Sequence, residues 1–295
     1  MATTDPTPSK PLGKVRAYIL RIAGLSTTAQ KVLRICNEPN TCANDLNRVI
    51  SLDPVLTGRV LQLINSAYYS LPSKVNSLTR AIILLGLNTV KNLVLSLAVF
   101  ESFSKRDTFR VFSADDFWTH SLSVAAGAKL LSIQHGVPLA EREDYFVAGL
   151  MHDIGKIPLN HLFPDKYRQA AELALGAGRA TRFGEQAMIG VDHCEVGDII
   201  ARKWQLSPAL AAALVGHHDL PGEGAGISMV GVVGLADILA HGMGAGIPGG
   251  SSLDENERQR ALAAWNLTSE ALAALTAAVA VEIEKARMFL EIARR

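Results

Sequence analysis

The sequence predicts an all-α protein, and three observations lead to this expectation. Nearly every long segment spaces its apolar residues three and four positions apart, the period of a helix that buries one face. No convincing run alternates apolar and polar residues, as a half-buried strand would. Hydrophobic residues make up 48% and charged residues 19% of the 295 positions, which excludes a disordered chain and predicts a large buried core.

Each expected helix is a segment with such an apolar stripe, and one has a clear start signal. Asp53 and Pro54 open a helix well, because aspartate caps the free N–H groups of a first turn and proline is tolerated within it. The expected helices cover residues 25–36, 55–65, 78–85, 89–100, 115–131, 142–151, 166–175, 194–204, 208–215, 227–240 and 269–292.

Breaks in composition indicate how these helices are grouped. The first residues hold prolines among small polar residues and lack the apolar segment of a signal peptide, so they are expected to form a flexible tail. A glycine-rich stretch without periodicity follows the last helix but one and is expected to be a linker. The expected parts are a tail at 1–14, an N-terminal helical half at 15–108, a second helical half at 109–240, the linker at 241–252 and C-terminal helices at 253–295.

Charge and cysteine content favour a cytoplasmic protein that does not bind nucleic acid. The 29 basic and 28 acidic residues give a net charge of +1, so no overall field attracts nucleic acid. Cys36, Cys42 and Cys194 are widely spaced and form no CxxC pair, which argues against a disulfide framework and favours a reducing compartment.

The most apolar stretch, residues 81–100, approaches the length of a membrane span. However, Asn88, Lys91 and Asn92 lie in its middle, where lipid would make them costly, and Gly86 interrupts it. We therefore expect two buried helices and no contact with a membrane.

The residues that carry chemistry are histidines and acids near the ends of expected helices. Asp116 and His120 lie four apart, on one helix face, and Asp237 interrupts an apolar helix, where an unpaired carboxylate would be costly. Such ligands suit iron, manganese or nickel, and zinc as well, and their number is enough for two divalent ions. The candidate metal ligands are Asp116, His120, His152, Asp153, His193, His217, His218 and Asp237.

Simpler explanations exist for several members of this set. An adjacent His152-Asp153 pair arises by chance in many chains, and His217-His218 could be a polar helix end. Asp116 could be an ordinary acid at a helix start. His135, His161 and His241 are assigned to loops, helix ends and solvent rather than to the site.

Two segments resemble a known family. Residues 52–100, with Asp53-Pro54, Asn65-Ser66-Ala67-Tyr68, Ala81-Ile82 and Leu85-Gly86, are similar to the HDOD domain of bacterial signalling proteins. The phrase GLMHDIGK at 149–156 resembles the motif of the HD superfamily of metal-dependent phosphohydrolases. The resemblance covers roughly residues 20–240 and implies an HD-like helical bundle with an N-terminal helical HDOD subdomain.

The HD-GYP branch of that superfamily hydrolyses cyclic di-GMP, and comparison with it implies roles for individual residues. Lys156 falls where a lysine approaches the substrate phosphate, and Asp153 and Lys156 would be the catalytic residues. Alternatively, Lys156 lies near a helix C-terminus, where its charge interacts favourably with the helix dipole. Asp116 falls where that branch often has a glutamate. The implied ligands of two metal ions are His120, His152, Asp153, His193, His217, His218 and Asp237.

The chain departs from that branch at two points. The paired histidines continue as HHDLPGEG (217–224) without the Gly-Tyr-Pro signature, and no arginine follows three residues after His120. The resemblance to the superfamily as a whole implies a metal-dependent phosphodiesterase or phosphohydrolase that acts on a nucleotide or cyclic dinucleotide.

The alternative is a catalytically silent regulatory or protein-interaction module. Apolar residues of the N-terminal helices could face a signalling partner, although plain core is the simpler interpretation, and the long C-terminal helix could form a homodimer. The residues considered for that surface are Leu84, Leu87, Val94 and Leu97.

Overall fold

The computed structural model describes residues 10–21, 24–38, 40–103, 108–219, 228–247, 259, 262–263, 265 and 267–294. Within these ranges the secondary structure is helical and holds no strand, so the predicted all-α class is confirmed. The N-terminal helices are α1 (Lys10–Arg21), α2 (Thr27–Cys36), α3 (Ala43–Ile50), α4 (Pro54–Ile64), α5 (Leu78–Leu85) and α6 (Leu87–Phe103). The remaining helices are α7 (Ala114–Gln134), η2 (Leu139–Glu141), α8 (Arg142–Met151), α9 (Lys156–Leu162), α10 (Pro164–Ala177), α11 (Thr181–Met188), α12 (His193–Trp204), α13 (Pro208–Gly216), α14 (Met229–Gly242) and α16 (Ser269–Ala293).

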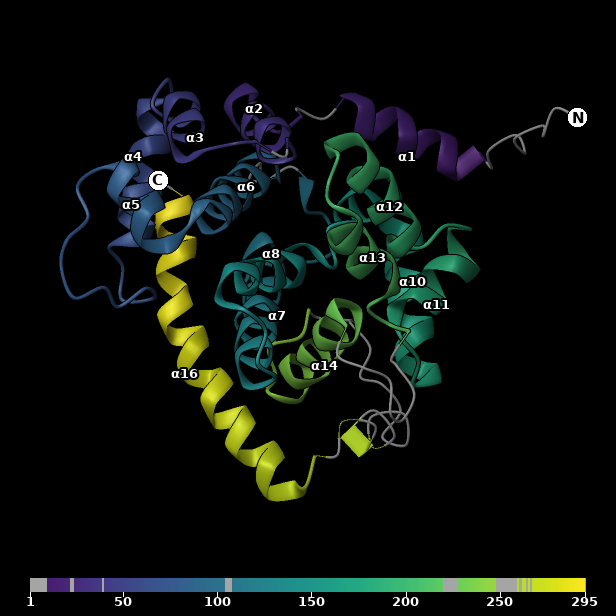
Figure 1. Ribbon diagram of the computed structural model, residues 1–295. Coiled ribbons are helices and arrows are strands. Elements are labelled where there is room, and N and C mark those ends of the chain that lie inside the picture. Colours follow the sequence, from purple (N-terminus) through teal and green to yellow (C-terminus); the bar gives the residue numbers. More distant parts are fainter. Residues whose placement is uncertain are drawn as a thin grey trace, which may run out of the picture.

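Helix α7 is the centre of the bundle. It packs against α8, α14 and the long α16, which runs along one side of the molecule (Figure 1). Its side chains are buried along most of its length, from Phe117 to Ser132, so no single apolar stripe distinguishes it. The last described residue of the chain, Arg294, pairs with Asp115 at the start of α7 across 2.7 Å. One helix thus anchors both the half that carries the histidines and the C-terminal helix.

Several helix boundaries extend the predicted ranges, and among the described residues four α-helices and the short η2 were not predicted. Residues 10–14, expected to belong to the flexible tail, form the start of α1; residues 1–9 lie outside the described part. Helix α1 buries Val15 and Ile19, one turn apart, and packs against α9 and α12. The other unpredicted helices, α3, α9 and α11, have eight residues or fewer, so their apolar period is too short to detect.

The polar residues within the apolar stretch at 81–100 connect the two halves of the domain. Asn88 and Asn92 donate to the carboxylate of Asp144 on α8 over 2.9 and 2.8 Å, and Lys91 pairs with the same carboxylate at 3.5 Å. These contacts explain why polar groups are retained in a segment that otherwise forms core. They attach α6 to the first turn of α8.

Gly86 separates α5 from α6 and turns the chain sharply. Its φ of 87° is one that glycine adopts without strain. The chain bends by 117° between α5 and α6. No individual helix among the described residues has both the length and the apolarity to cross a membrane; only this bent pair does so when taken together.

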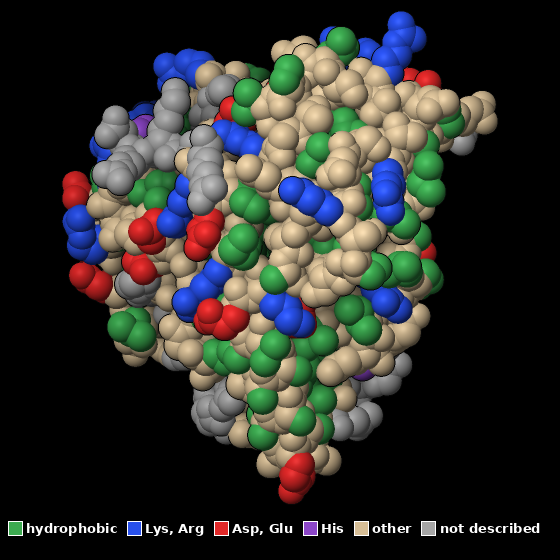
Figure 2. Space-filling view, turned by 90° about the vertical axis from the view of Figure 1, so that its left-hand side faces the viewer, with side chains coloured by type: hydrophobic (Ala, Val, Ile, Leu, Met, Phe, Trp, Pro, Cys, Tyr) green, Lys and Arg blue, Asp and Glu red, His purple; other side chains and the backbone are tan. Residues whose placement is uncertain are grey.

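The face that carries α16 holds interspersed basic and acidic side chains with scattered hydrophobic ones (Figure 2). Of the apolar residues considered as a partner surface, Val94 and Leu97 belong to the core and Leu87 is half-buried. Leu84 is exposed, as is its neighbour Ile83. That set therefore does not form one surface.

Gly155 lies where the chain leaves α8 and approaches the start of α12. A Cβ atom at this position would lie 2.0 Å from the carbonyl oxygen of His193, which is backbone and cannot move aside. In contrast, Gly58 is exposed in the middle of α4, and a Cβ there meets nothing within 4 Å.

We expect Gly155→Ala to lower the free energy of unfolding by at least about 3 kcal/mol, because the added methyl group overpacks two backbone segments. Gly58→Ala should raise it by about 0.5–1 kcal/mol through helix propensity alone. Urea unfolding followed by circular dichroism measures both. If both substitutions changed the free energy of unfolding by the same amount, the backbone contact between Gly155 and His193 would not be tight.

Candidate metal centre

Five helices bring the predicted histidines and acids to one buried place. His120 lies on α7, His152 and Asp153 end α8, and His193 opens α12. His217 and His218 follow α13, and Asp237 lies within α14. All of them are at most 7% exposed, except for the half-buried His218. Of the eight candidate ligands, seven therefore gather in a single cluster.

Asp153 lies between two groups of histidines, and its two oxygens face different groups. Its Oδ2 atom is 3.4 Å from Nε2 of His152 and 3.5 Å from Nε2 of His120. Its Oδ1 atom is 3.4 Å from Nε2 of His193 and 3.7 Å from Nε2 of His217. The carboxylate thus divides the cluster into two subsites, which we call the His120 subsite and the His193 subsite.

Asp237 completes the His120 subsite. Its Oδ1 atom lies 3.2 Å from Nε2 of His120 and 3.6 Å from Nε2 of His152. In the His193 subsite, His218 takes the corresponding place, with its Nε2 atom 3.0 Å from Nε2 of His193. Each subsite therefore offers at least three nitrogen or oxygen atoms that lie within 4.8 Å of one another.

Hydrogen bonds at the far side of the rings fix which nitrogen carries the proton. Nδ1 of His120 faces the carbonyl oxygen of Ala245 at 2.8 Å, and Nδ1 of His152 faces that of Gly149 at 2.7 Å. A carbonyl only accepts, so these nitrogens must be the protonated ones. The neutral rings then turn an Nε2 lone pair into the cluster, as metal-ligating histidines do.

The His193 subsite repeats this arrangement. Nδ1 of His193 donates to the carboxylate of Glu185 over 2.6 Å, and Nδ1 of His217 faces the carbonyl oxygen of Ala213 at 3.2 Å. Glu185 also accepts from the backbone N–H of His193 at 2.8 Å. Such carboxylate and carbonyl partners behind a histidine orient it toward a metal.

Among the described residues, several buried polar atoms of the cluster have no hydrogen-bond partner. They include Oδ1 of Asp153, Nε2 of His217 and Oδ1 of Asp237. In addition, Nε2 of His120 lies 3.3 Å from Nε2 of His152, which places two lone pairs opposite each other when both rings are neutral. Ligand atoms about 2.1 Å from one ion lie roughly 3.0–3.4 Å apart, so this spacing and the missing partners fit divalent metal ions.

Burial opposes a charge on every ring of the cluster, and the neighbouring groups decide the outcome. Beside Asp153 and Asp237, this effect is outweighed and the pKa of His152 is raised to about 9. The pKa of His217 is lowered to about 3, because burial is joined by the charge of neighbouring His152. Without metal, the imidazoles therefore differ widely in proton affinity.

Lys156 is buried and its ammonium group donates to Oδ2 of Asp153 over 2.5 Å. Burial works against its charge, but Asp153, Glu185 and Asp237 together raise its pKa. Lys156 opens α9 rather than ending a helix, so the interpretation through a helix C-terminus is wrong. Its charge is stabilised by carboxylates instead.

Asp116 lies outside the cluster, which corrects the expectation drawn from its spacing to His120. It is exposed, in the first turn of α7, and its carboxylate accepts from the hydroxyl of the capping Ser113 over 2.7 Å. Residues four apart share a helix face but differ in position along the axis by about one turn of 5.4 Å. In this structure, the shift of one turn places Asp116 in solvent while His120 lies in the cluster.

Two residues near the cluster were not predicted. His241 belongs to the last turn of α14 rather than to a linker, and its Nε2 atom lies 3.5 Å from Oδ1 of Asp237. Its spacing of four from Asp237 could have indicated this. Glu185 lies on the unpredicted α11, and nothing in the local pattern distinguishes it from a surface glutamate.

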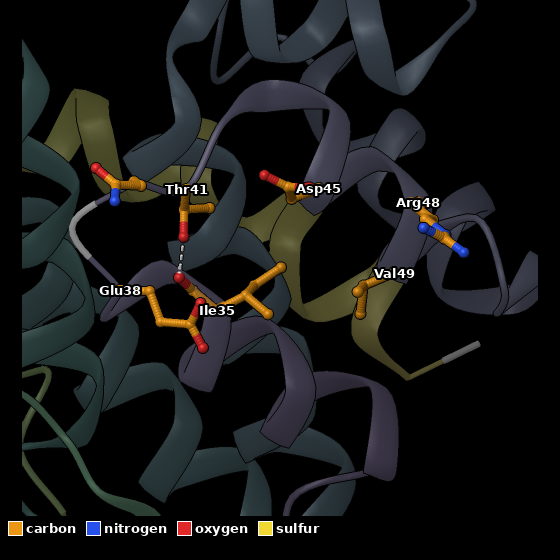
Figure 3. A pocket seen from close by; sticks show the side chains of 7 residues that line it. Ile35, Glu38, Thr41, Asp45, Arg48 and Val49 are labelled. Atoms are coloured by element: carbon orange, nitrogen blue, oxygen red, sulfur yellow. Dashed lines mark hydrogen bonds between the residues drawn. The ribbon is translucent and has the colours of Figure 1, made fainter.

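A separate pocket of about 400 Å³ lies between α2 and α3 (Figure 3). Glu38, Asp45 and Arg48 supply its charged groups, and Asp45 already accepts from the backbone N–H of Cys42 at 3.0 Å. None of the residues of the histidine cluster lines it. The chemistry predicted from the sequence therefore does not belong to this pocket.

The fold is thus a helical bundle that closes around a buried cluster of histidines and aspartates, a cluster that could hold a metal ion. The family model of the HDOD domain matches residues 22–220. The chain belongs to the HDOD family.

Solved structures share this fold. An HDOD domain protein of unknown function from Geobacter sulfurreducens is 24% identical, with a TM-score of 0.67 over 96% of this chain and 95% of that one. A protein from Shewanella amazonensis, provisionally named a metal-dependent phosphohydrolase, is 18% identical, with a TM-score of 0.61 over 92% of this chain and 96% of that one. A provisionally named signal transduction protein from Marinobacter aquaeolei is 19% identical, with a TM-score of 0.72 over 97% of this chain and 66% of that one.

An uncharacterized protein from Treponema pallidum is 23% identical over 200 residues. The match takes in 68% of this chain but spans only 38% of the length of that relative.

We expect the stability of the metal-free chain to be greatest near pH 6.5. A pKa raised to about 9 in the folded state, against 6.5 unfolded, gives His152 a stabilising contribution that is lost as the pH rises from 6.5 to 9. The lowered pKa of His217 has the opposite sign, so its contribution becomes unfavourable as the pH falls below 6.5. Urea unfolding of chelator-treated protein between pH 5 and 9.5 tests this; a flat profile would contradict it.

Proposed function

We propose that the chain is a metal-dependent phosphohydrolase that holds two divalent ions and acts on a nucleotide or cyclic dinucleotide. The observation that carries this proposal is the division of the cluster by Asp153, whose two oxygens each face a pair of imidazole lone pairs. A carboxylate in this position suits the bridge between two ions. Membership of the HDOD family and the fold shared with proteins provisionally named as phosphohydrolases support it.

The assignment of ligands follows the two subsites. One ion would be held by His120, His152, Asp237 and Oδ2 of Asp153, and the other by His193, His217, His218 and Oδ1 of Asp153. Iron, manganese and nickel suit these nitrogen and oxygen ligands, and zinc fits them as well. Bound ions of this kind supply Lewis acidity toward a phosphoryl group and toward water.

The remaining residues prepare the site. Glu185 holds the ring of His193 and fixes its tautomer, so the Nε2 lone pair stays directed into the cluster. Lys156 keeps Asp153 ionised and in position: burial alone would raise the pKa of Asp153, but Lys156 and His152 hold it well below its usual range. In this arrangement Lys156 acts on Asp153 first, and reaches a substrate phosphate only if that ion pair opens.

The second candidate function is a metal-binding regulatory module without turnover. The ion pair between Lys156 and Asp153 favours it, because Lys156 is only 4% exposed and its ammonium group, bonded to Asp153, is not presented to a substrate. The two candidates share the metal and differ only in catalysis.

We expect protein purified without chelator to contain up to two transition ions per chain, measured by elemental analysis. His152→Ala and Asp153→Ala should each lose ions, because each removes a ligand, whereas Asp116→Ala should retain them. Metal content far below one equivalent in the parent chain would contradict both candidate functions.

The two functions separate on a panel of phosphodiesters and nucleotides assayed with the metal-loaded protein. Turnover that Asp153→Ala abolishes while the circular dichroism spectrum stays unchanged supports the phosphohydrolase. Full metal content without turnover on any member of the panel favours the regulatory module.

Glu185→Ala should weaken metal binding about 10–100-fold, because the imidazole of His193 loses the carboxylate that orients it. Competition with a chromophoric chelator measures the affinity. Glu172→Ala, at an exposed position on α10, is the matched control and should have no effect. An affinity unchanged by Glu185→Ala would mean that the contact does not support a ligand.

A further inference from the structure

Cys194 lies beside the His193 subsite and has no part in the function proposed above. It is the second residue of α12, directly after His193, and its thiol is free and only 4% exposed. One donor atom from each of His193, Cys194, His217 and His218 lies within 4.8 Å of the others. The sulfur therefore belongs to the same group of atoms as the three imidazoles.

A buried cysteine is often simply a small apolar residue of the core. The surroundings of Cys194 are different, because one nitrogen atom of each of three imidazoles lies within 4.8 Å of its sulfur. In addition, Nε2 of His217 is buried and finds no hydrogen-bond partner in the described part of the chain. The apolar residues of α12 that do form core, such as Val196 and Ile200, lie further along the helix. The location of the thiol fits a ligand better than a packing residue.

We propose that Cys194 is a thiolate ligand of the ion in the His193 subsite. On binding, the S–H proton leaves to solvent and a sulfur–metal bond takes its place. The inference rests on the metal-binding part of the proposed function, and not on turnover.

The proposal makes the two subsites chemically different. The His120 subsite has carboxylate oxygens from Asp153 and Asp237, which suit iron or manganese. The His193 subsite would add a soft sulfur to its imidazoles, and thiolate ligands select zinc and cobalt over manganese. The chain would then hold a mixed pair of ions, with zinc in the His193 subsite.

The test is titration of the metal-free chain with Co²⁺, followed by absorption spectroscopy. A thiolate bound to Co²⁺ gives a charge-transfer band in the near ultraviolet, which imidazole and carboxylate do not. We expect the band in the parent chain, its loss in Cys194→Ser, and its retention in the matched controls Cys36→Ser and Cys42→Ser. Cys194→Ser should also weaken binding of one Zn²⁺ by at least about tenfold, by analogy with losses at supporting residues.

X-ray absorption of the zinc-loaded parent chain tests the same bond without a variant that has to fold. We expect a sulfur neighbour at about 2.3 Å from zinc. A shell of nitrogen and oxygen alone, or a cobalt band that persists in Cys194→Ser, overturns the inference and leaves the proposed metal centre intact. Failure of the parent chain to bind Co²⁺ or Zn²⁺ overturns both, whereas the band in a chain without turnover supports the inference and removes only the phosphohydrolase.

Discussion

The ionised carboxylate of Asp153, buried in the interior, is the constraint on which the rest of the structure depends. An isolated charge at this depth would be strongly unfavourable, and burial alone would protonate it. Lys156 compensates it on one side, and imidazoles from three other helices surround it. These imidazoles reach the carboxylate only if each helix ends or passes at the right place. The packing of α7, α8, α12 and α13 therefore determines the chemistry of the cluster.

The supporting contacts around the cluster are mostly backbone groups and residues outside the motif. Carbonyl oxygens of Gly149, Ala213 and Ala245 orient three of the rings, and Glu185 orients a fourth. These partners come from different segments of the chain, as do the ligands themselves. No single helix therefore carries a complete subsite. The contacts of Asn88 and Asn92 on α6 with Asp144 add a further link, since the first turn of α8 contacts α6 and His152 caps its other end.

The fold class and most of the cluster could be predicted from sequence because both depend on strong signals. The helical period is regular in the long helices, and Asp237 is conspicuous within an apolar one. Prediction from the sequence failed where the role of a residue depends on how deeply it is buried or on a partner far away in the chain. Asp116 has the right spacing to His120 but lies at the surface, while Glu185 looks like any surface glutamate and is fully buried. His241 was assigned to a glycine-rich linker, although α14 continues through it.

The absence of a side chain at Gly155 has a consequence for how the cluster keeps its shape. The turn that carries Asp153 rests directly on the carbonyl group of His193, main chain against main chain. The spacing of the two backbone segments that carry Asp153 and His193 is therefore set by main-chain contact. The metal centre proposed above would thus receive an ion with these two backbone segments already in place.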